Sequence, residues 1–170
     1  MSPDVRTQPR YADICSRFEA GVGRLEEKTQ KVSVQDTGRL TTARKNLQVT
    51  IATAAKVKEE YEALQLEFAA TLDRICGLDL KVLRAFSGSN ILGDLVECAK
   101  QIKGEIVQAI SSLDRVPARV ENLTVDATYN NLPRTITEDV QHLAGGPTRI
   151  LDKIEGLLKR LDHFEAAQAL

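Results

Sequence analysis

The side chains that could bind a metal or move a proton are few and scattered along the chain. His142 follows Glu138 by four residues and Asp139 by three, so the three could share one helix face. One histidine with two exposed acids is an incomplete metal site, because no second histidine is near in sequence and the usual pair of histidines four residues apart is absent. His163 lies near the end of the last predicted helix, where a protonated imidazole interacts favourably with the helix dipole. We interpret both histidines as surface residues and predict no metal site.

The three cysteines, Cys15, Cys76 and Cys98, are an odd number without short spacings. Zinc knuckles and CxxC redox motifs require closely spaced cysteines, and a disulfide framework requires an even number of them. We therefore predict free thiols in a reducing compartment. The N-terminus shows no signal-peptide pattern, and the expected location is the cytoplasm.

Motifs of enzymes and of nucleic-acid binders are missing from the sequence. The run Ala144-Gly145-Gly146-Pro147 precedes a predicted helix but lacks the Lys and Ser/Thr of a phosphate-binding loop. The net charge of −1 provides no basic excess for binding nucleic acid. We expect a protein without cofactor, enzymatic activity or nucleic-acid partner.

The elements that must carry the function are helices. Apolar residues make up 42% of the chain and recur at three- and four-residue steps, whereas the turn residues of a strand-rich fold are scarce. The sequence predicts an all-α, antiparallel bundle with a short extra helix at about 134–143. The four main helices are predicted at about 9–32, 36–76, 90–116 and 147–167. They form one domain, 9–170, after a disordered N-terminus, 1–8.

The first two predicted helices are separated by a polar turn. Apolar residues from Tyr11 to Val32 stack on one face of the first helix. Ser33-Val34-Gln35-Asp36 is then typical of a turn, with Ser33 or Asp36 capping the second helix.

The second predicted helix has the most regular pattern in the sequence. Apolar residues recur every seven positions along it, as in a coiled coil. We call its predicted interaction surface the heptad seam, formed by Leu40, Leu47, Ile51, Ala54, Tyr61 and Phe68. A rod of this length needs long neighbours, from the same chain or from another one.

The same helix is divided by charge. Bases occupy its first half and acids its second half, namely Arg39, Arg44, Lys45, Glu59, Glu60 and Glu62. One hypothesis is that the helix at 9–32 runs antiparallel to it and brings Glu26 and Glu27 near the bases. The other is an antiparallel homodimer of two such helices across a two-fold axis.

The last predicted helix carries bases beside a full apolar stripe, at Arg149, Lys153, Lys159 and Arg160. Such a helix packs into a bundle, binds a partner, or lies on an anionic membrane.

These patterns favour a non-enzymatic helical module that binds a partner helix through an apolar groove or seam. The expected partner is another protein or a second copy of the chain. The alternative is a membrane-active four-helix bundle of the cell-death executor or lipid-binding type. A third hypothesis is a carrier of an apolar ligand, although a small-molecule partner is not expected. The small residues that would leave room for the ligand are Ala52, Ala54, Ala55, Ala69 and Ala70.

Overall fold

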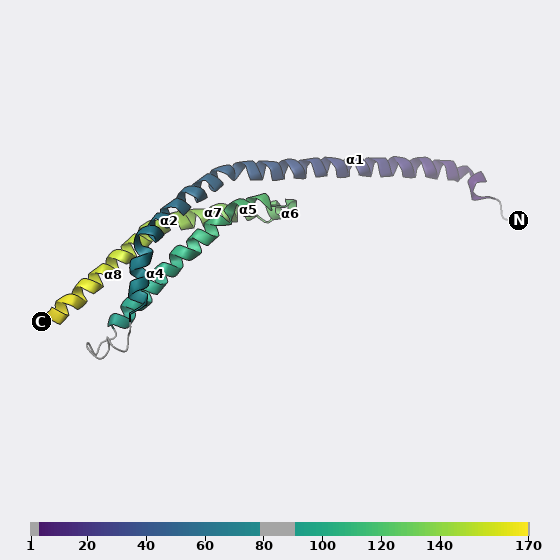
Figure 1. Ribbon diagram of the computed structural model, residues 1–170. Coiled ribbons are helices and arrows are strands. Elements are labelled where there is room, and N and C mark those ends of the chain that lie inside the picture. The colour runs from purple at the N-terminus through teal and green to yellow at the C-terminus, as the bar shows by residue number, and fades with distance from the viewer. Residues whose placement is uncertain (1–3, 79–90, 170) are drawn as a thin grey trace.

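The computed structural model describes residues 4–78 and 91–169, and these residues are almost entirely helical (Figure 1). Within these two ranges there is no strand, which confirms the all-α prediction for the described chain. The helices, in chain order, are α1 (Pro9–Asn46), α2 (Gln48–Cys76), α4 (Ile91–Asp114), α5 (Val116–Glu121), α6 (Val125–Tyr129), α7 (Leu132–Ala144) and α8 (Gly146–Ala169).

A short 3-10 turn, Val5–Thr7, precedes α1. The Asp4 carboxylate accepts a hydrogen bond from the Arg6 backbone N–H at 3.0 Å and pairs with its guanidinium. Pro9 then occupies the first turn of α1, where its fixed φ suits the helix and its missing N–H costs nothing. This turn lies within the segment 1–8, for which disorder is predicted.

The predicted turn at 33–36 is wrong, because α1 runs through it without a break to Asn46. No proline or glycine interrupts the stretch between Arg24 and Thr37. The hydroxyl of Thr37 donates to the Ser33 carbonyl at 2.9 Å, so these polar side chains bond back onto the helix. Ser33 and Asp36 consequently lie inside one helix and cap none.

The chain changes direction at Leu47, between α1 and α2 (Figure 1). Helical hydrogen bonds continue on both sides, from Leu47 N to the Ala43 carbonyl at 3.1 Å and from Ile51 N to the Leu47 carbonyl at 2.9 Å. The Leu47 side chain is only 3% exposed. Burial of this side chain draws the bend toward the core, so that α2 lies in the body of the protein while most of α1 does not.

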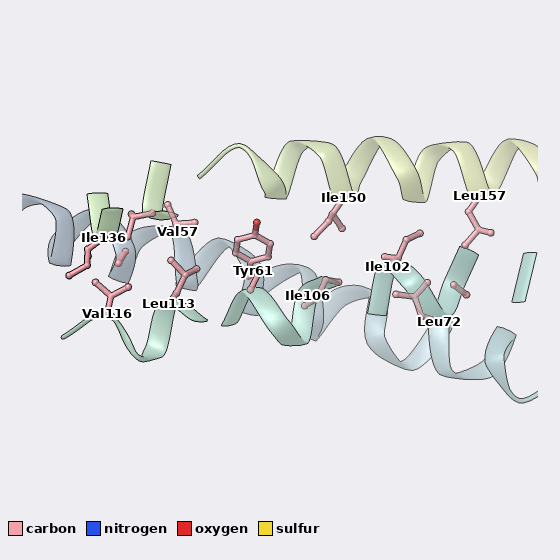
Figure 2. Packing of buried hydrophobic residues seen from close by; sticks show 14 of the residues in the cluster. Val57, Tyr61, Leu72, Ile102, Ile106, Leu113, Val116, Ile136, Ile150 and Leu157 are labelled. Atoms are coloured by element: carbon pink, nitrogen blue, oxygen red, sulfur yellow. The ribbon is translucent and has the colours of Figure 1, made fainter. Parts of the chain in front are cut away.

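The core lies between α2, α4 and α8 (Figure 2). Helices α2 and α4 run in opposite directions, since Lys58 pairs with Asp114 at 2.9 Å while Asp73, further along α2, pairs with Lys103. Ile102 of α4 is fully buried between them. Each such buried aliphatic side chain contributes roughly 1.5–3 kcal/mol of transfer free energy.

Three short helices, α5 to α7, close one end of this core, and only α7 is predicted, as 134–143. Val116 and Val120 of α5 are buried. The Thr124 hydroxyl caps α6 by accepting from Ala127 N at 3.3 Å. Asn131, with φ 58°, adopts the left-handed conformation that asparagine tolerates and turns the chain into α7.

The first predicted helix does not join the bundle as its fourth member. No residue of α1 is buried, and beyond its chain neighbours it contacts mainly α6, near the C-terminal end of α1. In Figure 1 the N-terminal part of α1 extends away from every other helix. The third and fourth predicted helices, 90–116 and 147–167, correspond to α4 and α8.

Candidate interaction face on the first helix

The last three turns of α1 are fixed to the bundle through Tyr129 of α6. The Arg39 guanidinium lies over the Tyr129 ring, 4.5 Å from its centroid. The Tyr129 hydroxyl donates to the Asp36 carboxylate, and this hydrogen bond raises the pKa of the tyrosine. These contacts end the uncovered part of α1 at Asp36.

One turn further on, Arg44 fastens α1 to the α5–α6 connection. Its Nη2 donates to the Leu123 carbonyl at 2.7 Å and to the Glu121 carbonyl at 3.1 Å. Glu121 is the last residue of α5 and Leu123 lies in the irregular connection after it, where carbonyls lack intrahelical partners. The guanidinium thereby satisfies two acceptors that a helix in this position would otherwise leave open.

Before Asp36, α1 presents an apolar stripe that nothing in the described chain covers. We define the α1 stripe as Tyr11, Ile14, Phe18, Val22, Leu25 and Val32. Phe18 is 73% exposed and Leu25 is 65% exposed. Single exposed apolar residues are ordinary, but a contiguous row on one helix face marks an interaction surface.

Charge differs between the two edges of the α1 stripe. Tyr11, Phe18, Leu25 and Val32 are seven residues apart, and the residue immediately before each of them is basic: Arg10, Arg17, Arg24 and Lys31. The residues after Phe18 and Leu25 are Glu19 and Glu26. One residue is about 100° of helix rotation, so the bases form one edge and the acids form the other. All six charged side chains are exposed.

The α1 stripe points to the same side as the bundle. From Val32 the four-residue steps continue through Asp36, which bonds to α6, and Leu40, which packs against the core. The bundle therefore closes one end of the stripe, while its other end is open.

The heptad seam is part of the core. Leu47, Ala54 and Tyr61 are buried, and Leu40, Ile51 and Phe68 are half-buried against them. The neighbours of the seam are α4, α7 and α8 of the same chain. The structure thus brings all six predicted residues together, but it covers them with the chain's own helices.

The charge-divided helix is two helices, because the bases lie in α1 and the acids lie in α2. Arg39 and Arg44 bind α6 and the α5–α6 connection, and Lys45 is exposed. Glu59 and Glu60 are exposed, and Glu62 lies 3.5 Å from Lys58 of the preceding turn. The hypothesis that Glu26 and Glu27 approach Arg39 and Arg44 is wrong, since all four belong to one continuous helix.

The bases of α8 are partly engaged within the chain. Arg149 Nη2 donates to the His142 carbonyl at 3.2 Å, and Lys153 pairs with Glu105 of α4. Lys159 and Arg160 are exposed. The apolar side chains Ile150 and Leu157 of this helix point into the core (Figure 2).

The acids near His142 have other partners. Glu138 pairs with Arg134 at 2.9 Å, and Asp139 pairs with Arg119 at 3.0 Å. Within residues 4–78 and 91–169, no group of three or more histidine, cysteine or acidic side chains is arranged to hold a metal ion. The cysteines in these ranges are free thiols.

An open apolar hollow of about 430 Å³ lies where the ends of α2, α4 and α8 meet. Phe68, Leu95 and Phe164 are among the side chains that line it. None of the five small residues named for the carrier hypothesis lines it.

Comparison with known proteins adds no relative, since no protein family, curated protein or solved structure matches the chain. In the part of the chain that the structure describes, none of the helices is both long enough and apolar enough to cross a membrane.

The α1 stripe was visible in the sequence as a helical face, but its exposure was not. With a turn predicted at 33–36, this face was expected to pack against the bundle. The basic residue before each of Tyr11, Phe18, Leu25 and Val32 is a signal that the sequence contains and that charge counts over whole helices conceal.

Proposed function

We propose that the protein is a non-enzymatic assembly module that binds a partner helix along the α1 stripe. The observation that carries the proposal is the contrast between the two apolar faces of the chain. The heptad seam is covered by the chain's own helices, whereas the α1 stripe is exposed along about six helical turns.

The energetics favour a covered stripe. Removing an aromatic or branched aliphatic side chain from water is worth roughly 1.5–3 kcal/mol, and the α1 stripe has six large apolar residues. Ordering both partners offsets part of this gain. A partner helix that covers the stripe would still gain enough for stable association, as in other helix-in-groove complexes.

The attachment of α1 supports a role as a presenting arm. Asp36, Arg39 and Arg44 fix its last turns, so the uncovered part continues a helix that is already formed. A preformed helix loses less conformational entropy on binding than a disordered segment does.

Site-specific photo-crosslinking in cells tests this proposal. A photoreactive phenylalanine analogue at Phe18 lies on the stripe, and the same analogue at Glu27 lies on the opposite face as a matched control. We expect protein adducts from position 18 and few from position 27. Equal adducts at both positions, or none at position 18, would contradict the proposal.

The alternatives have weaker support. For a membrane-active bundle, α8 would have to withdraw Ile150 and Leu157 from the core. For an apolar-ligand carrier, the hollow near Phe68 offers suitable side chains but is open to solvent.

A further inference from the structure

We infer that the partner of the α1 stripe is a helix of a different protein whose apolar face is flanked by acidic residues. This inference rests on the proposed function and specifies the partner's chemistry. It is carried by the order of charges along α1 and by the position of the bundle relative to the stripe.

The basic edge is the dominant charge feature of the stripe. Arg10, Arg17, Arg24 and Lys31 recur every seven residues, so they stay on one edge over about three heptads. The acidic edge has only Glu19 and Glu26. Charges that flank an apolar seam set the choice of partner in paired helices. A partner with acids beside its apolar face therefore pairs with more of the charges that flank the α1 stripe than a partner with bases there does.

Intramolecular pairs leave this edge available. In the described chain, Arg17 lies 3.8 Å from Asp13 and both side chains are largely exposed. The guanidinium of Arg24 lies above Gly21, which offers no charge. Breaking either contact would cost little free energy when an acidic partner approaches.

A second copy of the chain fits the stripe poorly in either direction. In an antiparallel pair, like edges face each other, so the basic edges of the two copies would meet and Arg17 would approach Arg24 of the other copy. In a parallel pair, basic and acidic edges would meet. The bundle, however, lies on the stripe side from Asp36 onward, and the two bundles would occupy the same space.

Two designed peptide helices test the inference on the whole chain. Both have leucine at the apolar heptad positions, and the flanking positions are all glutamate in one and all lysine in the other. Neither peptide pairs strongly with itself, because its own flanking charges repel. Fluorescence anisotropy with labelled peptide at low ionic strength gives the two affinities.

We expect the glutamate-flanked peptide to bind about tenfold more tightly than the lysine-flanked peptide. Arg17→Glu with Arg24→Glu should abolish or reverse this preference, and Lys45→Glu with Lys56→Glu, exposed bases away from the stripe, should leave it unchanged. Equal binding of the two peptides, tighter binding of the lysine-flanked one, or no binding would overturn the inference.

Light scattering of the purified chain tests whether the partner is a second copy of the same chain. We expect a monomer across the micromolar range, and a dimer that Phe18→Glu disrupts would also overturn the inference. The photo-crosslinking result separates the two proposals. If position 18 still forms protein adducts, only the acidic chemistry of the partner is wrong, and if it forms none, the proposed function itself is wrong.

Discussion

The hydroxyl of Tyr61 occupies the space where a side chain at Gly146 would begin. A Cβ built on Gly146 would lie 1.7 Å from Tyr61 Oη and 2.8 Å from its Cζ. The same hydroxyl donates to the Leu143 carbonyl at 2.7 Å. Tyr61 of α2 therefore holds the junction between α7 and α8 on the core, and this junction has room for glycine alone (Figure 2).

We expect Gly146→Ala to lower the free energy of unfolding by about 1–3 kcal/mol, as overpacking does in other cores. Urea denaturation followed by circular dichroism measures the change. Gly156→Ala on the same helix is the matched control, because its Cβ would meet nothing within 4 Å. That control should be neutral or stabilising by up to about 1 kcal/mol. A loss in both variants would show that close packing against Tyr61 is not the cause.

Tyr61→Phe should lower the free energy of unfolding by about 1 kcal/mol, because the Leu143 carbonyl loses its side-chain donor. Combined with Gly146→Ala, it should recover part of the loss, since the atom nearest the new methyl group is gone. The ring carbon at 2.8 Å remains, so recovery should be incomplete. A double-mutant cycle measures the coupling, and strict additivity would refute the contact.

The α1 stripe should contribute almost nothing to the stability of the isolated chain. Phe18→Ser should change the free energy of unfolding by less than about 0.5 kcal/mol, because the side chain is already exposed. Ile102→Ala should cost about 2–5 kcal/mol, because that side chain is fully buried. If Phe18→Ser destabilises the chain as much as Ile102→Ala does, the stripe is covered within the chain.

Arg44→Lys should loosen the connection between α5 and α6. Lysine cannot reproduce the planar guanidinium that reaches the carbonyls of Glu121 and Leu123 together. Hydrogen exchange should become faster in 122–129 and stay unchanged in the centre of α4. The control is Lys45→Arg, one residue along and exposed. Unchanged exchange in Arg44→Lys would show that Arg44 does not fix α1 to the bundle.

The ion pair of Lys58 and Asp114 should give stability a defined pH dependence. Lys58 lowers the pKa of Asp114 below its ordinary value of 3.8 by a hydrogen bond. A carboxyl whose pKa is lowered by folding stabilises the native state above the unfolded-state pKa and loses this effect as pH falls through the folded one. The stability difference between wild type and Asp114→Asn should be constant from pH 7 to 5. It should shrink below about pH 3.8.

Urea titrations at several pH values measure that difference. In a Lys58→Met background, Asp114→Asn should have a smaller and flatter effect, because the partner is missing. A difference that grows toward low pH would contradict the assigned pair.

The sequence predicted the helices wherever the apolar periodicity agreed with the positions of glycine and proline. The end of α2 at Cys76 and the start of α8 beside Gly146 and Pro147 follow from glycine and proline. Short α5 and α6 were missed, because six and five residues are too few to show a helical period. The break at Leu47 was also missed, since only tertiary burial of this leucine causes it.

The candidate site was predicted only in part, for a physical reason. Periodicity shows which side chains share a face, but it does not show whether another helix covers that face. The heptad seam around Tyr61 and the stripe around Phe18 have similar patterns, yet one is buried and the other exposed. The difference arises at Ser33 and Asp36, where polar residues were interpreted as a turn although nothing there breaks a helix.

The proposed role of α1 depends most on the continuity of this helix through 33–36. Spin labels at Glu19→Cys and Lys45→Cys, with the three native cysteines replaced by alanine, measure it directly. Both positions are exposed and lie on α1. Electron–electron double resonance should give a distance near 39 Å, since 26 residues of helix rise about 1.5 Å each. A distance below about 20 Å would mean that the chain turns back at 33–36 and packs its stripe onto the bundle, which would contradict the account.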